Sequence, residues 1–182
     1  MHVVLQLFPL NKKLELILIS YIALAVSVVL VGLDQIIKMI VQTNLQLHES
    51  IQFIPGLINF TYVENTGAAF SSFDGQRWFL IILTGVVMLF MLYLLCFKKL
   101  KNSIMIWHVA VIFAGGVGNL IDRIVRGAVI DYIELDFINF AIFNFADCLV
   151  VVGVISLLIY LLFFDQSDLF HRKEKSQPEK AE

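Results

Sequence analysis

Four long uncharged stretches dominate the pattern of hydrophobic and polar positions along the chain. A helix needs roughly 17–25 mainly apolar residues to cross a bilayer, and each stretch reaches that length. A charged residue follows directly after each of them, which is where a helix would leave the hydrocarbon. The sequence therefore predicts membrane-spanning helices at about residues 16–33, 79–97, 103–121 and 148–164.

The first stretch has an alternative interpretation as a cleaved signal peptide. Such a peptide has an apolar core of about 7–15 residues before a small-residue cleavage site. The small residues Ala23 and Ala25 lie in the middle of this stretch, and hydrophobic residues continue beyond them. We therefore expect residues 16–33 to be retained as a span.

Residues 43–77, between the first two spans, follow a different pattern. Apolar and polar residues alternate from Ile58 to Tyr62, the period of two that is typical of a strand. The strand leads into residues 64–71, where Asn65 can both donate and accept hydrogen bonds and Gly67 lets the backbone approach another group closely. A loop of this composition is more often a turn than a binding site, so the pattern alone leaves both interpretations open.

The composition indicates an integral membrane protein. Hydrophobic residues make up 59% of the chain and the mean hydropathy is +0.86, whereas a soluble domain is about 45–50% apolar. With a net charge of −2 and no basic patch, we expect no nucleic-acid partner. The two cysteines show no metal-ligand or disulfide spacing. At 182 residues we expect one membrane domain (residues 16–164), flanked by a short N-terminal arm (residues 1–15) and a polar tail (residues 165–182).

Basic residues predict the orientation of the chain in the membrane. Nine of the thirteen Lys and Arg residues lie before the first span, between the second and third spans, and after the fourth. The positive-inside rule places these segments in the cytoplasm, together with both termini. The remaining two loops, residues 43–77 and 122–147, are then expected at the outer face.

Asp147 is a lone carboxylate inside an otherwise uncharged run from Phe137 to Phe164. Such a group is costly in a membrane and is functional by default, although an aspartate at the start of a helix can simply be its N-terminal cap. Two further carboxylates, Asp122 and Asp131, lie nearby in the sequence, together with three amides. The cluster favours a functional site; its amides are Asn119, Asn139 and Asn144.

Carboxylates are also the chemistry that remains after other motifs are excluded. The chain has no HExxH or Cys/His zinc spacing, no G-x-S-x-G elbow, and no P-loop or dinucleotide fingerprint. Two aspartates in contact tend to share one proton. One carboxylate can then activate water as a general base while the other, protonated, polarises a carbonyl. This reasoning does not decide whether Asp122 or Asp131 pairs with Asp147.

Five short segments occur in a fixed order: DQIIK (34–38), NTGAAFS (65–71), GGVGNLIDR (115–123), VIDY (129–132) and FNFAD (143–147). Together they closely resemble the lipoprotein signal peptidase family, also called signal peptidase II. The resemblance extends over about residues 16–164. It implies a multi-pass protein of the bacterial inner membrane, mainly α-helical, with four transmembrane helices and a small extracytoplasmic β-cradle.

The resemblance also implies roles for individual residues. The aspartates of the fourth and fifth segments, Asp131 and Asp147, would form a catalytic pair in an aspartic endopeptidase. Asp34, Lys38 and Asp122 would give structural support, with Asp122 holding Arg123 or backbone. The residues expected to bind substrate are Asn65, Gly67, Asn119, Arg123 and Asn144.

The family's substrates are prolipoproteins whose lipobox cysteine already carries diacylglycerol, and cleavage occurs just before that cysteine. The resemblance implies these substrates and membrane lipids as partners and no cofactor, and we expect a monomer. The chain departs from the family at Cys148, where a small residue is more common, and in the compact piece at residues 134–142.

Two alternative functions stay open at this stage. Intramembrane aspartyl proteases of the prepilin-peptidase or presenilin type carry a G-x-G-D signature, but here Gly116-Val117-Gly118 is followed by Asn119. A small proton-coupled transporter would use intramembrane carboxylates as relays. Transporters usually have more spans and internal repeats, which this chain lacks.

Overall fold

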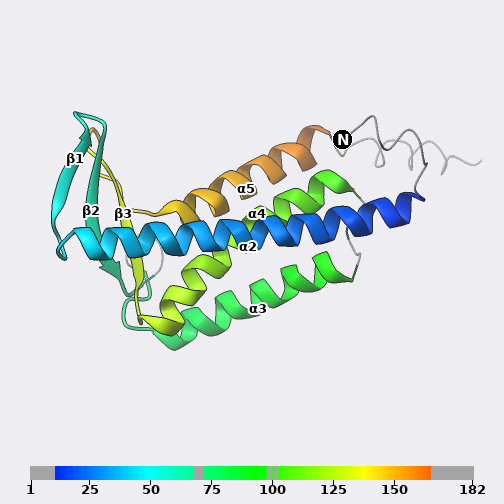
Figure 1. Ribbon diagram of the computed structural model, residues 1–182, viewed down its shortest axis with the longest axis horizontal. Helices are drawn as coiled ribbons and strands as arrows, with labels where there is room; N and C mark the ends of the chain where they lie inside the picture. The colour runs from blue at the N-terminus through cyan, green and yellow to red at the C-terminus, as the bar shows by residue number, and fades with distance from the viewer. Residues whose placement is uncertain (1–10, 68–71, 98–99, 101, 165–182) are drawn as a thin grey trace, which may run out of the picture.

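The structure, a computed structural model, describes residues 11–67, 72–97, 100 and 102–164. Most of the lysine-rich 98–101 loop, residues 1–10 of the expected N-terminal arm and the polar tail lie outside these residues. The described part contains helices α2 (Lys12–Asn44), α3 (Arg77–Cys96), α4 (Ser103–Val125) and α5 (Phe145–Phe163), and strands β1 (Ser50–Ile54), β2 (Ile58–Asn65) and β3 (Val129–Leu135). The helices lie side by side, with the strands gathered at one end (Figure 1).

All four helices are long and apolar enough to cross a membrane. The predicted fold class, four spanning helices with a small sheet, is therefore confirmed. The 33 residues of α2 correspond to about 50 Å of helix, more than the roughly 30 Å thickness of the hydrocarbon core. The helix continues past the predicted span because Asp34 and Lys38, whose charges follow that span, are fully buried against Asp122 of α4.

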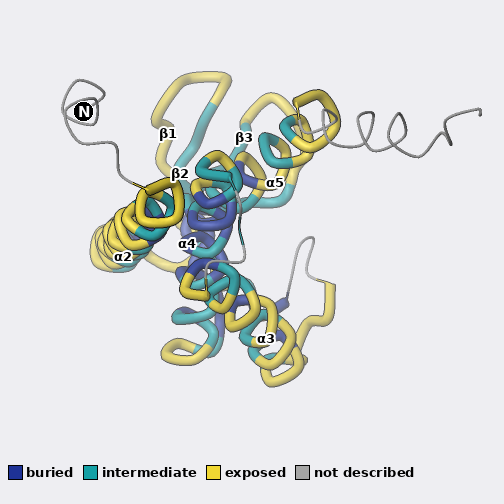
Figure 2. The backbone as a smooth tube through the Cα atoms, turned by 90° about the vertical axis from the view of Figure 1, so that its right-hand side faces the viewer, coloured by how far each residue is buried: buried dark blue, intermediate teal, exposed yellow. Residues whose placement is uncertain are grey.

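Helix α4 occupies the centre of the bundle and packs against the other three helices. Figure 2 shows its buried backbone among the more exposed helices. The glycines of the GGVGNLIDR segment explain this position, because a Cβ atom at each glycine would collide with a different neighbour. These neighbours are the Ala146 carbonyl of α5 for Gly115, the Met88 side chain of α3 for Gly116, and the Asp34 carboxylate of α2 for Gly118.

The sheet is antiparallel, in the order β1-β2-β3. The strand predicted from the alternation at residues 58–62 is confirmed as part of β2. A register shift between Phe60 and Val63 brings Val63 opposite Asp131 of β3. The sheet packs against the end of α2 through a cluster of Val41, Tyr62, Ile130 and Tyr132. This packing places Asp131 where the sheet meets the helices.

Candidate active site

Asp131 and Asp147 come from different elements and are joined by one residue. Asp131 in β3 is 3% exposed, and Asp147 in the first turn of α5 is half-buried. The side-chain amide of Asn144 donates to Oδ1 of Asp131 at 2.6 Å. The backbone N–H of Asn144 donates to Oδ2 of Asp147 at 3.1 Å. Asn144, itself fully buried, therefore bridges the two carboxylates.

Asp147 is the third residue of α5 and not its N-cap, the alternative considered from the sequence. The N-cap is Asn144, whose side-chain oxygen accepts the N–H of Asp147 at 3.0 Å. The two residues thus form a reciprocal capping box. The second oxygen of Asp147 accepts a hydrogen bond from Nδ2 of Asn119 at 2.7 Å. Asp147 therefore caps a helix and belongs to the polar cluster at the same time.

Side chains of β3, of α2 and of the N-cap residue satisfy the first three N–H groups of α5. The first N–H donates to the Tyr132 hydroxyl of β3 at 3.2 Å, the second to the Asp34 carboxylate of α2 at 3.1 Å, and the third to Asn144. These groups have no partner within a helix. The turn that carries Asp147 is therefore fixed by the sheet, by α2 and by its own cap.

Both oxygens of Asp131 accept hydrogen bonds from amides. Asn144 donates to one, and Nδ2 of Asn65 donates to the other at 3.0 Å. Burial, and next the negative charge of Asp147, raise the pKa of the Asp131 carboxyl to about 6, although the two amides and the charge of Lys38 act in the opposite direction. Asp147 is thus close enough to influence the ionisation of Asp131.

Lys38 sets the orientation of the Asn119 side chain. Its ammonium group donates to Oδ1 of Asn119 at 2.8 Å, and the amide of Asn144 donates to the same oxygen at 3.2 Å. Because an ammonium group cannot accept a hydrogen bond, the oxygen of Asn119 faces Lys38 and its NH₂ group faces Asp147.

Lys38 also belongs to a buried ionic network. Its ammonium group lies 2.9 Å from Asp34 and 2.7 Å from Asp122, and all three side chains are fully buried. Asp34 and Lys38, four residues apart on α2, therefore pair inside the bundle and not at its surface. Arg126 lies 2.5 Å from Asp122, so two cations balance two carboxylates. Such compensation is what allows charges to be buried.

The side-chain partner of Asp122 differs from the one expected. Its carboxylate contacts Lys38 and Arg126 and accepts the backbone N–H of Ile130 at 3.4 Å. The backbone contact matches the expectation. Arg123 points instead toward the end of β2, where it donates to the carbonyl of Gly67 at 2.8 Å. Gly67 belongs to the NTGAAFS segment (65–71), and its residues 68–71 lie outside the described part of the chain.

Arg77 is a residue of this region that the sequence analysis missed. Its Nε atom donates to the carbonyl oxygen of Arg123 at 2.7 Å. The helix dipole disfavours a cation in the first turn of a helix. The position of Arg77 directly before the second apolar stretch could therefore have indicated a role outside its own helix. Asn139, by contrast, was counted in the sequence cluster, but it is exposed in the loop after β3.

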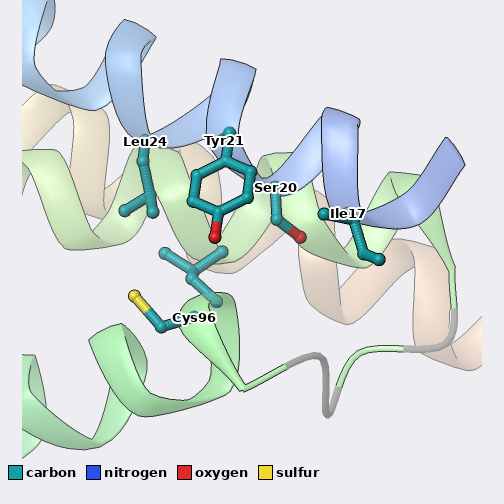
Figure 3. Close-up of a pocket in the computed structure, with 6 residues that line it drawn as sticks. Ile17, Ser20, Tyr21, Leu24 and Cys96 are labelled. Atoms are coloured by element: carbon teal, nitrogen blue, oxygen red, sulfur yellow. The ribbon is translucent and has the colours of Figure 1, made fainter. Parts of the chain in front are cut away.

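Other candidate sites in the described residues are weaker. No group of three or more His, Cys, Asp or Glu side chains within them is arranged to hold a metal ion. A small pocket lies between α2 and α3 (Figure 3), toward the ends of these helices remote from the sheet. Its walls carry no charged group; they are formed by Ile17, Ser20, Tyr21, Leu24, Leu95 and Cys96.

Comparisons with known proteins give the family to which the chain belongs. A family model described as "Signal peptidase (SPase) II" matches residues 26–163. The lipoprotein signal peptidase of Enterococcus faecalis is 42% identical over 145 residues, covering 78% of this chain and 88% of that protein. The lipoprotein signal peptidase of Streptococcus thermophilus is 41% identical over 151 residues, covering 82% and 98%.

A solved structure of a bacterial membrane enzyme, obtained by the in meso method at 2.3 Å, has the same fold. It superposes with a TM-score of 0.72 at 31% identity, covering 88% of this chain and 93% of that one. The family match, the close relatives and the shared fold all agree. The chain therefore belongs to the signal peptidase II family and is a multi-pass bacterial membrane peptidase.

Proposed function

We propose that this peptidase is an aspartic endopeptidase that removes the signal peptide from diacylglyceryl-modified prolipoproteins, with Asp131 and Asp147 as its catalytic pair. The observation that carries the proposal is the bridge that Asn144 forms between the two carboxylates. Family membership supports the substrate class, since relatives at about 40% identity are named lipoprotein signal peptidases.

The two carboxylates share one proton, because two adjacent negative charges in a buried site are unfavourable. The ionised carboxylate takes a proton from a water molecule as that water attacks the scissile carbonyl. The protonated carboxyl polarises the carbonyl oxygen. Collapse of the tetrahedral intermediate breaks the C–N bond, with a proton delivered to the leaving amine. The products are a signal peptide ending in a carboxylate and a lipoprotein beginning with the lipidated cysteine.

The surrounding amides hold the pair in position. Asn65 and Asn144 donate to Asp131, and Asn119 and Asn144 donate to Asp147. Preorganised donors of this kind need no rearrangement during the reaction. Around them, the ionic network of Asp34, Lys38 and Asp122 supports Asn119 and the first turn of α5.

Substrate binding is assigned to the edge of this cluster. Arg123 and Gly67 lie where β2 approaches α4, and the asparagine amides beside them can bind an extended peptide backbone. The diacylglycerol of the substrate stays in the lipid and keeps the scissile bond near the interface. We place this interface at the outer face of the inner membrane and expect the enzyme to act as a monomer in contact with membrane lipids.

The direct test is a mass measurement of signal-peptide release from a diacylglyceryl-modified prolipoprotein incubated with purified enzyme in detergent. Asp131→Asn and Asp147→Asn should each lower the rate by a factor on the order of 10²–10⁴, the usual contribution of acid–base catalysis. The double variant should be hardly slower than either single variant, because residues acting as a unit are non-additive. Asp136→Asn, at an exposed position directly after β3, is the matched control and should cleave normally.

Two outcomes would contradict the assignment. Normal cleavage by Asp131→Asn, with a well-folded but inactive Asp122→Asn, would make Asp122 the partner of Asp147. Full activity in both Asp131→Asn and Asp147→Asn would rule out the aspartic mechanism.

Cleavage by the wild type in detergent, without any ion gradient, would exclude the proton-coupled transporter.

A further inference from the structure

Arg77 occupies an unusual place for a cation. It is the first residue of α3, where the helix dipole disfavours positive charge. Its guanidinium lies 5.4 Å from the centre of the Trp78 ring, within the range of a cation–π contact. The contact with Trp78 does not account for two further hydrogen bonds, which Arg77 makes to α4.

Those two bonds complete the C-terminal end of α4. Nε of Arg77 donates to the carbonyl of Arg123 at 2.7 Å, and its Nη2 atom donates to the carbonyl of Ile124 at 2.9 Å. The last four carbonyl groups of a helix receive no hydrogen bond from N–H groups of the same helix. The helix dipole also favours a cation at this end. Arg77 thus caps α4 from a neighbouring helix, and Figure 1 shows the start of α3 beside the end of α4.

The turn after α4 passes close to this cap. Gly127 has a φ angle of +89°, and a Cβ atom there would lie 3.5 Å from Nη1 of Arg77. A positive φ of this size strains most other residues. The guanidinium therefore fits between the last turn of α4 and the start of the segment that leads to β3.

Arg123 is consequently attached to the β2–α3 connection at two points. Its side chain donates to the carbonyl of Gly67 just after β2, and its backbone carbonyl accepts from Arg77 at the start of α3. One bond fixes the guanidinium and the other fixes the backbone that carries it. Loss of the backbone bond would let the last turn of α4 shift, and the side chain would shift with it.

We infer that Arg77 is a positioning residue that holds Arg123 in its substrate-binding place by capping the end of α4. The inference rests on the proposed function, in which Arg123 binds the backbone of the substrate. An ordinary packing residue of α3 would affect the enzyme whether or not Arg123 is present. If the inference holds, substitution of Arg77 affects substrate binding only through Arg123.

The test is a double-mutant cycle of Arg77→Gln and Arg123→Lys, measured as the rate of signal-peptide release at several concentrations of a diacylglyceryl-modified prolipoprotein. Arg77→Gln should raise KM by about tenfold, the weight of one charge-assisted hydrogen bond, and change kcat much less. Arg123→Lys should also raise KM, because lysine lacks the planar fork. The double variant should be no worse than Arg123→Lys alone.

Met88→Ala is the matched structural control. Met88 is another α3 residue that packs on α4, at Gly116. Its loss should lower thermal stability and the amount of active enzyme without changing KM, and its effect should add to that of Arg123→Lys. If Arg77→Gln does not accumulate, Arg77→Lys, which keeps the charge but not the fork, enters the same cycle with a smaller expected rise in KM.

Additive effects of the Arg77 and Arg123 substitutions, or an unchanged KM in the Arg77 variant, would overturn the inference. Wild-type kinetics in Arg123→Lys would also overturn it, since Arg77 would have no route to the substrate. These failures leave wild-type cleavage intact. An inactive wild-type enzyme would instead contradict the proposed function itself.

Discussion

At the scale of single residues, Asp131 is a carboxyl group whose ionisation depends on the fold around it. Burial, and then the charge of Asp147, raise its pKa from 3.8 to about 6. Between these two values the folded state binds more protons than the unfolded chain. The free energy of unfolding therefore falls as the pH rises through this window. Above it, the folded protein carries a buried carboxylate that the unfolded chain would expose to water.

Asp131→Asn should remove this pH-dependent penalty. Between pH 4 and pH 7, the free energy of unfolding of the variant should improve relative to wild type by about 3 kcal/mol, the equivalent of the pKa difference. A constant offset is expected in addition, because an asparagine offers one acceptor oxygen to the two amides of Asn65 and Asn144. Unfolding in detergent at a series of pH values measures both quantities.

The matched control for this measurement is Asp136→Asn. Asp136 is exposed, so its substitution removes no buried carboxylate, and the corresponding improvement should be much smaller. A difference between Asp131→Asn and wild type that stays constant from pH 4 to pH 7 would contradict the account of its burial.

The sequence indicated the polar residues of the site better than it indicated their partners. Asp131, Asp147 and Asn144 stood out as polar groups in apolar surroundings, which is a local property. The burial of Lys38 depends on contact with Asp122 from a helix distant in sequence, and no local pattern reports such a contact. Arg77 was missed for the same reason, since its partners are backbone carbonyls that every residue has.

At the scale of elements, the helices and strand β2 could be predicted from the sequence. The length of an apolar stretch and the period of its apolar residues are properties of the local sequence. Strand β1 was not predicted as a separate element, since its alternation of polar and apolar residues stops where Phe53 and Ile54 follow one another. The continuation of α2 from residue 34 to Asn44 was also not predicted. Asp34 and Lys38 are charged residues that usually mark the end of a span, but in the structure they form a buried ion pair. The central position of α4 depends on which neighbour each glycine faces.

Gly118→Ala tests this packing. The added Cβ would lie 2.6 Å from Oδ2 of Asp34 and 3.3 Å from Cβ of Ala146. We expect a loss of about 1–3 kcal/mol in stability, typical of overpacking. Cleavage should also fall, because Asp34 holds the first turn of α5. Thermal unfolding and signal-peptide release measure the two effects.

Gly85→Ala is the control, since it is also a mid-helix glycine but a Cβ there meets nothing within 4 Å. Alanine favours helix by up to about 1 kcal/mol over glycine, so this variant should be as stable as wild type or more so, and fully active. Equal behaviour of the two alanine variants would show that Gly118 is not a packing requirement.

At the scale of the whole molecule, the candidate site lies at the sheet end of the bundle, and the start of α2 lies at the other (Figure 1). The fold alone does not say which end faces the cytoplasm. The distribution of lysine and arginine does, and much of it lies in residues 98–101 and 165–182, outside the described part of the chain. Orientation therefore stays a prediction from charge.

Reporter fusions test the orientation. A reporter active only in the cytoplasm should work when fused after Lys101 or after Glu182, because the positive-inside rule places both positions there. The same reporter inserted between Gln52 and Ser72 should be silent. Activity from that insertion would invert the protein in the membrane and place the site at the inner face.

The capping box of Asn144 and Asp147 also limits how the chain can change in length during evolution. One residue inserted between them would turn the acid by about 100° around the α5 axis, away from Asn119. Residues 136–140, between β3 and the box, are all exposed, so insertions and deletions there leave both ends of the site attached. The spacing between the two aspartates is therefore free to vary among homologues, whereas the step of three residues from amide to acid is not.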